Sequence, residues 1–179
     1  MNQIANKQMP VHAAAGIIAD LRRIPKQLSP ALFYDQRGSQ LFDQICELPE
    51  YYVTRVETAI LQRHAAAMAQ AIGEQALLVE LGSGSSIKTR LLLDALPSLA
   101  AYVPMDISRA HLLESAQALA ADYPQLDVMP LCADFLQAFT LPQPQRAANR
   151  VVFFFPGSTI GNLDTVQAKK LLTRLRSMA

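Results

Sequence analysis

Cysteine and histidine are both scarce in this sequence. Its 179 residues contain two cysteines, Cys46 and Cys132, which are too few for a disulfide framework or a cysteine-rich zinc site. We interpret both as core thiols of a protein in a reducing compartment. The three histidines, His12, His64 and His111, are scattered along the chain without the spacing of metal ligands. We therefore predict no metal site.

An excess of charge of one sign and long apolar runs are also lacking. The net charge of +1, with 17% charged residues, argues against a nucleic-acid-binding protein, and 51% hydrophobic residues argue against disorder. Residues 1–24 hold one short apolar stretch interrupted by charges, which fits neither a membrane span nor a signal peptide. We expect one cytoplasmic domain with no nucleic-acid or membrane partner and with a small, nearly neutral ligand.

Apolar runs alternate with helical patterns after residue 75. The sequence predicts strands at Leu77–Leu81, Tyr102–Met105, Asp127–Leu131 and Val151–Phe155, and helices at Lys88–Leu96, Ser108–Asp122 and Thr165–Ser177. Short strands that are apolar throughout suit a parallel sheet with both faces covered, and right-handed crossovers then give a doubly wound, Rossmann-like α/β fold. The stretch between Asp134 and Arg150 is rich in proline and polar residues, so we expect it to be mostly loop.

The preceding residues, 1–75, have a mainly helical pattern, which is clearest from Glu57 to Gly73 after the loop-like stretch LPEYYVTRVE. We expect two parts: a helical segment, 1–75, that caps the ligand edge of the sheet, and a Rossmann-like domain, 76–179. In open parallel sheets, ligands bind beyond the carboxyl ends of the strands, where the connecting loops converge. The loops after the four predicted strands are therefore the expected place of a site.

The first of these loops, ELGSGSSIK, has Gly82 and Gly84 in a turn and Lys88 near the start of the next helix. Glycine lets backbone N–H groups approach a ligand that a Cβ would hold away. The phosphate loop of a nucleoside triphosphatase would end in Gly-Lys-Ser/Thr, whereas Ile87 precedes the lysine here. A dinucleotide-binding turn would have a third glycine in place of Ile87. These departures disfavour a triphosphatase and an NAD-dependent oxidoreductase.

Acidic residues follow the next two strands. Asp106 lies 24 residues after Gly82, where a carboxylate can accept hydrogen bonds from both hydroxyls of an adenosine ribose. Asp134 and Phe135 follow the third strand, where a carboxylate and a ring suit the amino group and the face of an adenine. Each acid by itself is equally explained as a turn residue or a helix cap. Their occurrence at successive strand ends favours an adenosine-containing ligand.

The fourth strand runs into the glycine-rich stretch FFFPGSTIGNLD. One interpretation is a turn in which Asn162 or Asp164 caps the next helix. The other places Asn162 beside the reactive end of the ligand, because the loop after this strand faces that end. The residues alone leave both interpretations open.

Four stretches together resemble a known family. They are FYDQRGSQLFDQICELPEYYVTRVETAIL, LVELGSGSSIKTRLLLDAL, YVPMDIS and FFPGSTIGNL. The set is similar to class I S-adenosylmethionine-dependent methyltransferases, and specifically to the histidine-specific methyltransferases, whose members trimethylate the α-amino group of L-histidine to hercynine in ergothioneine biosynthesis. The resemblance runs from about Leu28 to the end of the chain. It implies an enzyme with the cofactor S-adenosyl-L-methionine and the substrate L-histidine.

The resemblance also implies roles for single residues. In the cofactor site these are Gly82, Gly84 and Lys88 at the amino-acid end, Asp106 at the ribose, and Asp134 and Phe135 at the adenine. In the substrate site they are Tyr51 and Asn162 at the amino-acid group of histidine, and Tyr34 near a closing lid. Without the resemblance, the tyrosines are equally explained by amphipathic packing against the sheet.

The chain ends in the helix after the fourth strand, whereas members of the family continue with further strands and an inserted substrate domain. We therefore expect an incomplete sheet in a fragment that is inactive alone. The strand VVFFF would be an exposed edge that a dimer or another chain covers. The alternative is a non-catalytic S-adenosylmethionine-binding or partner-assembly module.

Overall fold

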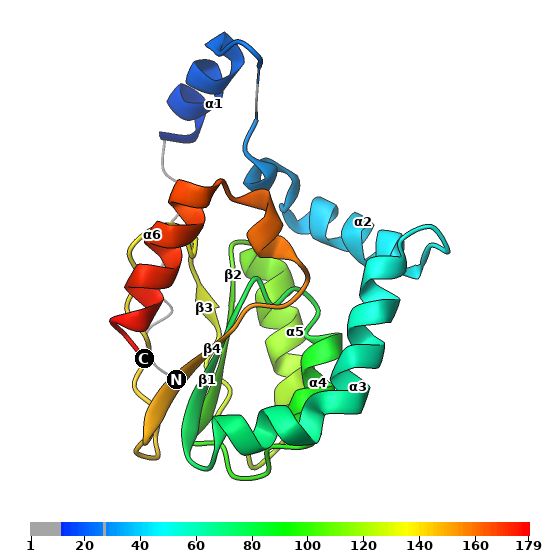
Figure 1. The fold of residues 1–179 in the computed structure, drawn as a ribbon, viewed down its shortest axis with the longest axis vertical. Helices are drawn as coiled ribbons and strands as arrows, with labels where there is room; N and C mark the ends of the chain where they lie inside the picture. The colour runs from blue at the N-terminus through cyan, green and yellow to red at the C-terminus, as the bar shows by residue number, and fades with distance from the viewer. Residues whose placement is uncertain (1–11, 27) are drawn as a thin grey trace. The chain divides into compact units, whose positions relative to one another are not determined.

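The computed structural model describes residues 12–26 and 28–179. The chain divides into two compact units, Met1–Tyr34 and Asp35–Ala179. The described residues of the smaller unit include helix α1 (His12–Arg22) and the 3-10 helix η1 (Pro30–Phe33) (Figure 1). The division expected from the sequence, with a capping segment 1–75 and a cofactor-binding domain 76–179, stays a prediction.

The larger unit alternates strands with helices (Figure 1). Its elements are α2 (Gln36–Glu47), α3 (Tyr52–Ile72), β1 (Ala76–Leu81), α4 (Ile87–Leu93), β2 (Ala101–Asp106), α5 (Arg109–Asp122), β3 (Leu131–Cys132), β4 (Arg150–Phe154), the 3-10 helix η2 (Thr159–Asn162) and α6 (Thr165–Arg176). The strands form one parallel sheet in the order β3-β2-β1-β4. This order is that of a doubly wound sheet, so the predicted α/β, Rossmann-like fold class is confirmed.

The place of each strand in the sheet explains its burial. β1 pairs with β2, where Leu77 lies opposite Ala101, and with β4, where Leu77 lies opposite Val151. All residues of β1 are buried, because both of its edges are paired and both of its faces are covered. β4 pairs with β1 alone and is mostly half-buried. It forms an edge of the described sheet, as expected for VVFFF.

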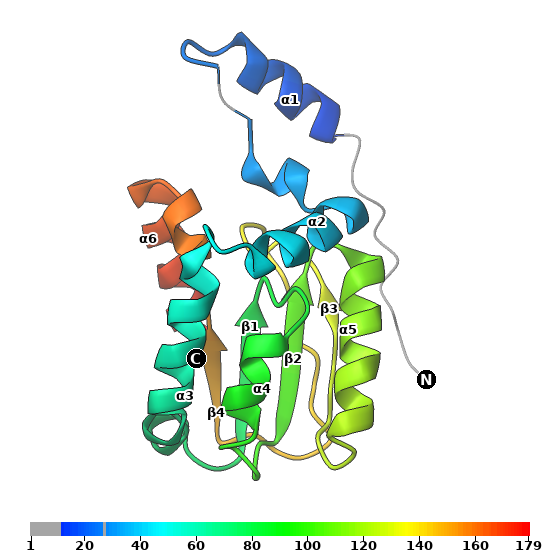
Figure 2. The ribbon, with the colours of Figure 1, turned by 90° about the vertical axis from the view of Figure 1, so that its right-hand side faces the viewer.

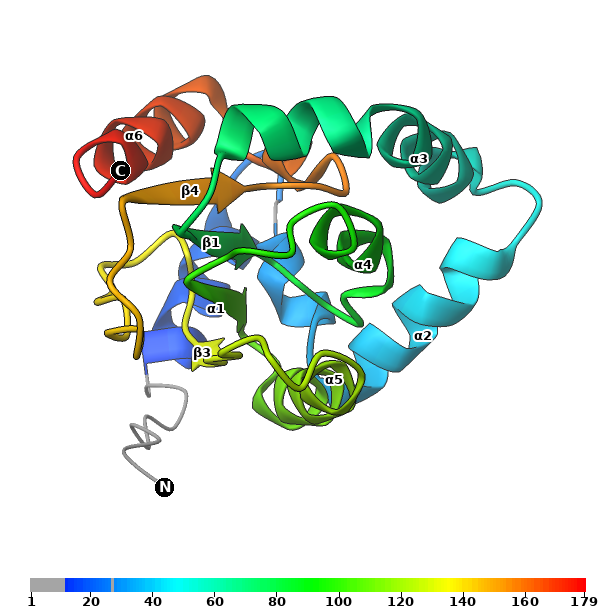
Figure 3. The ribbon, with the colours of Figure 1, turned by 90° about the horizontal axis from the view of Figure 1, so that it is seen from below.

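Alternate strand residues pack into two cores, one on each face of the sheet. On one face, α3, α4 and α5 cover a core that includes Leu78 and Leu92. On the other face, α6 and the loop after β3 cover a core that includes Val79 and Leu171. Figure 3 shows α4 and α5 on one side of the strands and α6 on the other. The prediction of a sheet covered on both faces is confirmed.

The third strand is shorter than predicted. β3 spans Leu131–Cys132 rather than Asp127–Leu131. Tyr102 on β2 still forms a parallel bridge with Val128. The ladder is interrupted between this bridge and β3, because Pro104 on β2 has no N–H to donate to the carbonyl of Met129.

Helix α3 begins earlier than the sequence pattern indicates. It starts at Tyr52, so more than half of the stretch LPEYYVTRVE is helical rather than loop. The Arg55 side chain donates to the carbonyl of Leu48 at 2.8 Å and also to the carbonyl of Pro49, which closes the preceding loop onto the first turns of the helix. Between β3 and β4 the chain is loop, as predicted.

The two cysteines are not core residues, which corrects the interpretation from the sequence. Cys46 is half-buried and Cys132 is exposed, and both are free thiols. Cys132 lies on β3, which pairs only with β2 in the described sheet, so its outer flank is uncovered.

Residues 12–26 and 28–179 have neither a membrane-spanning helix nor a cluster of metal-ligating side chains. No helix there is long and apolar enough to cross a membrane. The same residues contain no group of three or more His, Cys, Asp or Glu side chains suited to hold a metal ion. Residues 1–11, part of the stretch compared with a signal peptide, lie outside the described residues.

Candidate functional site

The glycine turn after β1 bends across the edge of the sheet where the strands end (Figure 2). Gly82 and Gly84 have φ angles of +69° and +52°, which glycine adopts without strain. The N–H groups of Gly82 and Ser83 both donate to the Met105 carbonyl of β2, at 2.8 and 3.0 Å. The turn is thereby fixed against the end of the neighbouring strand.

The space beside this turn is open on one side. A Cβ built on Gly84 would meet no atom within 4 Å, and a Cβ on Gly82 would meet the Phe135 ring at 3.9 Å. A ligand can therefore approach the backbone at Gly84. Gly82 and Phe135, predicted to hold opposite ends of the cofactor, border the same space.

Asp106 connects the ends of β1 and β2. Its Oδ2 accepts from the Gly84 N–H at 3.1 Å, and its Oδ1 accepts from the Ser108 N–H at 2.9 Å. These bonds orient the carboxylate. An ionised carboxylate has about four acceptor positions, so Asp106 can accept two further hydrogen bonds, such as those of ribose hydroxyls.

Two buried hydroxyls near these residues have no hydrogen-bond partner. Ser83 is 7% exposed and Ser108 is 5% exposed, and the side-chain oxygen of each is unpaired. Ser83 adjoins Gly84 in the turn, and Ser108 follows Asp106. A buried hydroxyl without a partner costs free energy, so a polar ligand that reached these oxygens would be favoured.

A buried acid lies at the base of the turn. Glu80 on β1 is 2% exposed and accepts from the Thr89 hydroxyl at 2.6 Å and from the Tyr102 hydroxyl. Burial raises the pKa of Glu80 to about 7, although the two hydrogen bonds lower it in part. The Tyr102 hydroxyl also lies 3.2 Å from the Ser86 hydroxyl. This network joins the two central strands to the start of α4.

The loop after β3 carries Asp134 and Phe135. The Asp134 Oδ1 accepts from the Leu136 N–H at 2.8 Å, which is the turn role that was the alternative to a ligand contact. The Phe135 ring packs edge-to-face on Phe155, with centroids 5.1 Å apart. Arg174 on α6 donates to the Phe135 carbonyl. The ring predicted to face adenine is therefore held between the glycine turn and the end of β4.

Lys88 is bound by a residue that the sequence did not point to. Its ammonium pairs with the carboxylate of Glu57 on α3, and the two side chains are 24% and 22% exposed. The other oxygen of this carboxylate accepts from the Gly157 N–H, after β4, at 2.6 Å. Glu57 is 31 residues from Lys88 and 100 residues from Gly157, so no local pattern indicates these contacts.

Asn162, a predicted substrate residue, ends η2 and is exposed. The cap of α6 is Asp164, whose side chain accepts from the Gln167 N–H in a capping box. Of the two candidates for that cap, the structure selects Asp164. This leaves the Asn162 side chain without that structural role, and its contact with the substrate stays a prediction.

The two tyrosines of the predicted substrate site lie in different units. Tyr51 precedes α3 in the larger unit, and its ring packs edge-to-face on Phe42, with centroids 5.9 Å apart. This packing is against helix α2, whereas the alternative to a ligand contact was packing against the sheet. Tyr34 ends the smaller unit. Contacts in the structure thus link Gly84 to Asp106 and place Phe135 next to Gly82, whereas the roles of all the predicted cofactor and substrate residues stay predictions.

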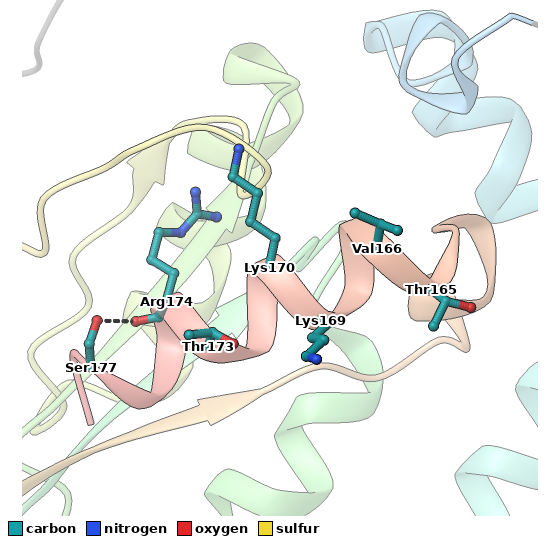
Figure 4. Close-up of a pocket in the computed structure, with 7 residues that line it drawn as sticks. All are labelled: Thr165, Val166, Lys169, Lys170, Thr173, Arg174 and Ser177. Atoms are coloured by element: carbon teal, nitrogen blue, oxygen red, sulfur yellow. Dashed lines mark hydrogen bonds between the residues drawn. The ribbon is translucent and has the colours of Figure 1, made fainter.

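A shallow depression of about 770 Å³ runs along α6 (Figure 4). The residues that line it are Thr165, Val166, Lys169, Lys170, Thr173, Arg174 and Ser177. All of them belong to this helix or its C-cap, and none is a predicted site residue. Among these residues, Arg174 contacts the candidate site, through its bond to the Phe135 carbonyl.

Known proteins match this chain along most of its length. Histidine N-alpha-methyltransferase of Mycobacterium tuberculosis is 44% identical over 163 residues, which are 89% of this chain and 49% of that protein. The protein of the same name from Mycolicibacterium smegmatis is 42% identical, over 88% of this chain and 49% of that protein. Ergothioneine biosynthesis protein 1 of Neurospora crassa is 36% identical, over 83% of this chain and 17% of that protein.

The chain spans about half the length of the two mycobacterial relatives. The model of one protein family matches residues 13–179, a range that includes all four strand-end loops and every predicted site residue. The chain belongs to the family of histidine-specific, S-adenosylmethionine-dependent methyltransferases.

Proposed function

We propose that this chain forms the cofactor-binding half of an enzyme that methylates the α-amino group of L-histidine, towards trimethylhistidine (hercynine). The observation that carries the proposal is that the glycine turn after β1 is bonded to Asp106 at the end of β2 and lies next to Phe135 after β3, whose ring packs on Phe155 after β4. Because those loops converge at one edge of the sheet, a single ligand can reach all of them.

The residues present fit S-adenosyl-L-methionine. The open side of Gly84 admits a ligand close to the backbone, and the remaining acceptor positions of Asp106 suit the two hydroxyls of a ribose. The unpaired hydroxyls of Ser83 and Ser108 offer further hydrogen bonds. Lys88 would bind the carboxylate of the ligand. When bound, the cofactor supplies an electrophilic methyl group.

The contribution of the chain's own residues to methyl transfer would be orientation and exclusion of water. The attacking amine must be neutral and aligned, and the displacement needs little acid–base catalysis. Tyr51 and Asn162 would orient the amino-acid group of histidine, while Asp134 and Phe135 would fix the adenine end of the cofactor. A site without water favours the neutral amine over the ammonium.

A chimera tests this function. Residues 1–179 would replace the matching half of the Mycobacterium tuberculosis relative, and the purified protein would be incubated with S-adenosyl-L-methionine and L-histidine. We expect mono-, di- and trimethylhistidine by mass spectrometry. The same chimera with Asp106→Ala should form product at least about tenfold more slowly at low cofactor concentration, because its cofactor affinity is reduced.

Two outcomes of this experiment would contradict the proposal in different ways. A folded chimera that binds S-adenosyl-L-homocysteine but methylates no histidine would contradict the substrate. A folded chimera that does not bind S-adenosyl-L-homocysteine would contradict the cofactor. The first outcome would favour the alternative of a non-catalytic binding or assembly module.

We also propose a cytoplasmic location without nucleic-acid or membrane partners, and a dimer or another chain that covers the edge of β4. The free thiols of Cys46 and Cys132 suit a reducing compartment, and a net charge of +1 gives no strong attraction to nucleic acid. An unpaired strand edge is a template for association. Sedimentation velocity should show a dimer, whereas a monomer at every concentration would contradict the dimer and leave another chain as the proposed cover of the β4 edge.

A further inference from the structure

One carboxylate ties together three segments that are far apart in the sequence. Glu57 on α3 pairs through Oε2 with Lys88 on α4 and accepts through Oε1 from the Gly157 N–H after β4. Lys88 and Gly157 both follow the carboxyl ends of strands. Glu57 therefore reaches the first turn of α4 and the loop after β4 from a helix outside the sheet.

A carboxylate is the side chain suited to this place. The Lys88 Nζ lies 3.8 Å from the position that a Cβ of Gly157 would take, so the ammonium and the Gly157 turn are close neighbours. The ammonium and the Gly157 N–H can only donate, so each needs an acceptor. A carboxylate has two acceptor oxygens, whereas a side-chain amide has one. The pair is mostly buried, which limits screening by solvent.

The start of α3 also holds the loop that carries Tyr51. Arg55 donates to the carbonyls of Leu48 and Pro49, which precede Tyr51 in the chain. Two side chains on the first turns of α3 thus fix different parts of the candidate site. Arg55 fixes the loop before the helix, and Glu57 fixes the first turn of α4 and the loop after β4.

We propose that Glu57 is a positioning residue that holds the Lys88 ammonium and the Gly157–Asn162 turn in place relative to each other. The inference rests on the proposed function, in which Lys88 binds the carboxylate of the cofactor and Asn162 the amino-acid substrate. Loss of the shared carboxylate frees the ammonium and also removes the link between the cofactor side and the turn that carries Asn162.

Two readouts on the full chain test this role. Calorimetry gives the Kd of S-adenosyl-L-homocysteine and of 5′-methylthioadenosine, which has the adenosine but lacks the carboxylate. Hydrogen exchange followed by NMR gives the protection of the Gly157 N–H. Glu57→Ala should raise the Kd of S-adenosyl-L-homocysteine about fivefold and accelerate exchange of the Gly157 N–H about tenfold. The Kd of 5′-methylthioadenosine should stay within about twofold, because it does not report on Lys88.

Glu57→Gln separates the two contacts. Its single acceptor oxygen should stay on the Lys88 ammonium, because a hydrogen bond from a charged donor is the stronger one. The amide nitrogen then faces the Gly157 N–H and cannot accept. We expect exchange of the Gly157 N–H to accelerate about tenfold, while the Kd of S-adenosyl-L-homocysteine stays within about threefold.

Glu114→Ala, at an exposed position on α5, is the matched control and should change neither readout. If the wild-type chain binds S-adenosyl-L-homocysteine and Glu57→Ala alters neither its Kd nor the exchange of Gly157, the inference is overturned and the proposed function stands. If Glu57→Ala does not fold, Glu57→Gln provides the test. An unchanged hydrogen-exchange rate of the Gly157 N–H in that variant overturns the inference. A folded wild-type chain that does not bind S-adenosyl-L-homocysteine overturns the proposed function itself.

Discussion

Asp106 has a structural role that precedes any contact with a ligand. Its carboxylate holds the N–H groups of Gly84 and Ser108, so it fixes the glycine turn against the end of β2. The residue was predictable, because an acid at the end of an apolar strand follows the glycine turn at a typical spacing. The two hydrogen bonds were not predictable, because they depend on how the turn folds over the sheet edge.

Asp106→Ala should weaken the binding of S-adenosyl-L-homocysteine by about 1.5 to 3 kcal/mol, the cost of losing hydrogen bonds to a charged acceptor. Calorimetry on the purified chain measures this difference. Asp106→Asn is the matched variant, since it keeps the shape and one acceptor oxygen and should weaken binding less. Equal affinity of Asp106→Ala and wild type would remove Asp106 from the site.

Glu80 should make the stability of the fold depend on pH. Folding raises its pKa from 4.5 to about 7, so its stabilising contribution is full below pH 4.5 and is lost as the pH rises through 7. Glu80→Gln stays neutral, so its free energy of unfolding should rise relative to wild type by about 2 to 3 kcal/mol from about pH 5 to about pH 7.5. Urea unfolding at several pH values measures this difference.

The control for Glu80 is Glu114→Gln, at an exposed position on α5. It makes the same substitution outside the buried network of Glu80, Thr89 and Tyr102, so a change with pH that only Glu80→Gln shows belongs to the buried carboxyl. A constant difference between Glu80→Gln and wild type over this pH range would show that Glu80 ionises in the folded chain as it does in water.

At the scale of secondary structure, the central strands were the most predictable elements. β1, β2 and β4 lie within about one residue of their predicted ends, because each is a short apolar run bounded by turn residues. β3 was not predictable to this accuracy, because Pro104 on the neighbouring strand β2 interrupts its ladder. The early start of α3 depends on bonds from Arg55 to the preceding loop, which periodicity does not reveal.

For the loops that carry the predicted substrate residues, the sequence indicated the turn after β4 but not the contacts that hold the loops in place. The stretch GSTIGN marked the turn after β4, but its link to α3 through Glu57 joins residues 100 positions apart and has no signal in a single sequence. The position of Tyr51 just before α3 was likewise hidden, because the pattern placed the start of that helix near Glu57. Side-chain contacts determine both the link of the turn after β4 to α3 and the position of Tyr51, and sequence periodicity does not reveal such contacts.

Asn162→Ala and Tyr51→Phe should act on the substrate and not on the cofactor. In the active chimera, each should raise the KM for histidine, while the Kd of S-adenosyl-L-homocysteine stays within about twofold of wild type. The reason is that both side chains are proposed to contact only the amino-acid substrate. Steady-state kinetics and calorimetry on the same preparations measure the two effects, and equal losses for both ligands would indicate a folding defect instead.

At the scale of the whole molecule, the described sheet ends at β4, which has one hydrogen-bonded neighbour. The six predicted cofactor residues lie in the loops after β1 and β3, at the end of β2 and in α4. The chain nevertheless spans only about half of its mycobacterial relatives. Cofactor binding and catalytic turnover are therefore expected to separate in residues 1–179.

Residues 1–179 alone should not methylate histidine in multiple turnovers. Methyl transfer needs the amine about 3 Å from the methyl carbon in a closed site without water, and half of a relative's length is not expected to close such a site. Mass spectrometry of the chain incubated with S-adenosyl-L-methionine and L-histidine is the measurement. Trimethylhistidine in clear molar excess over the protein would refute this expectation.

The central claim is that the strand-end loops form a site for an adenosyl amino acid, and calorimetry of residues 1–179 with S-adenosyl-L-homocysteine, NADH and ATP tests it most directly. We predict one-to-one binding of S-adenosyl-L-homocysteine and at least about tenfold weaker binding of NADH and ATP, because Ile87 interrupts both phosphate-binding patterns. NADH or ATP bound as tightly as S-adenosyl-L-homocysteine, or a folded chain that does not bind S-adenosyl-L-homocysteine, would contradict the claim.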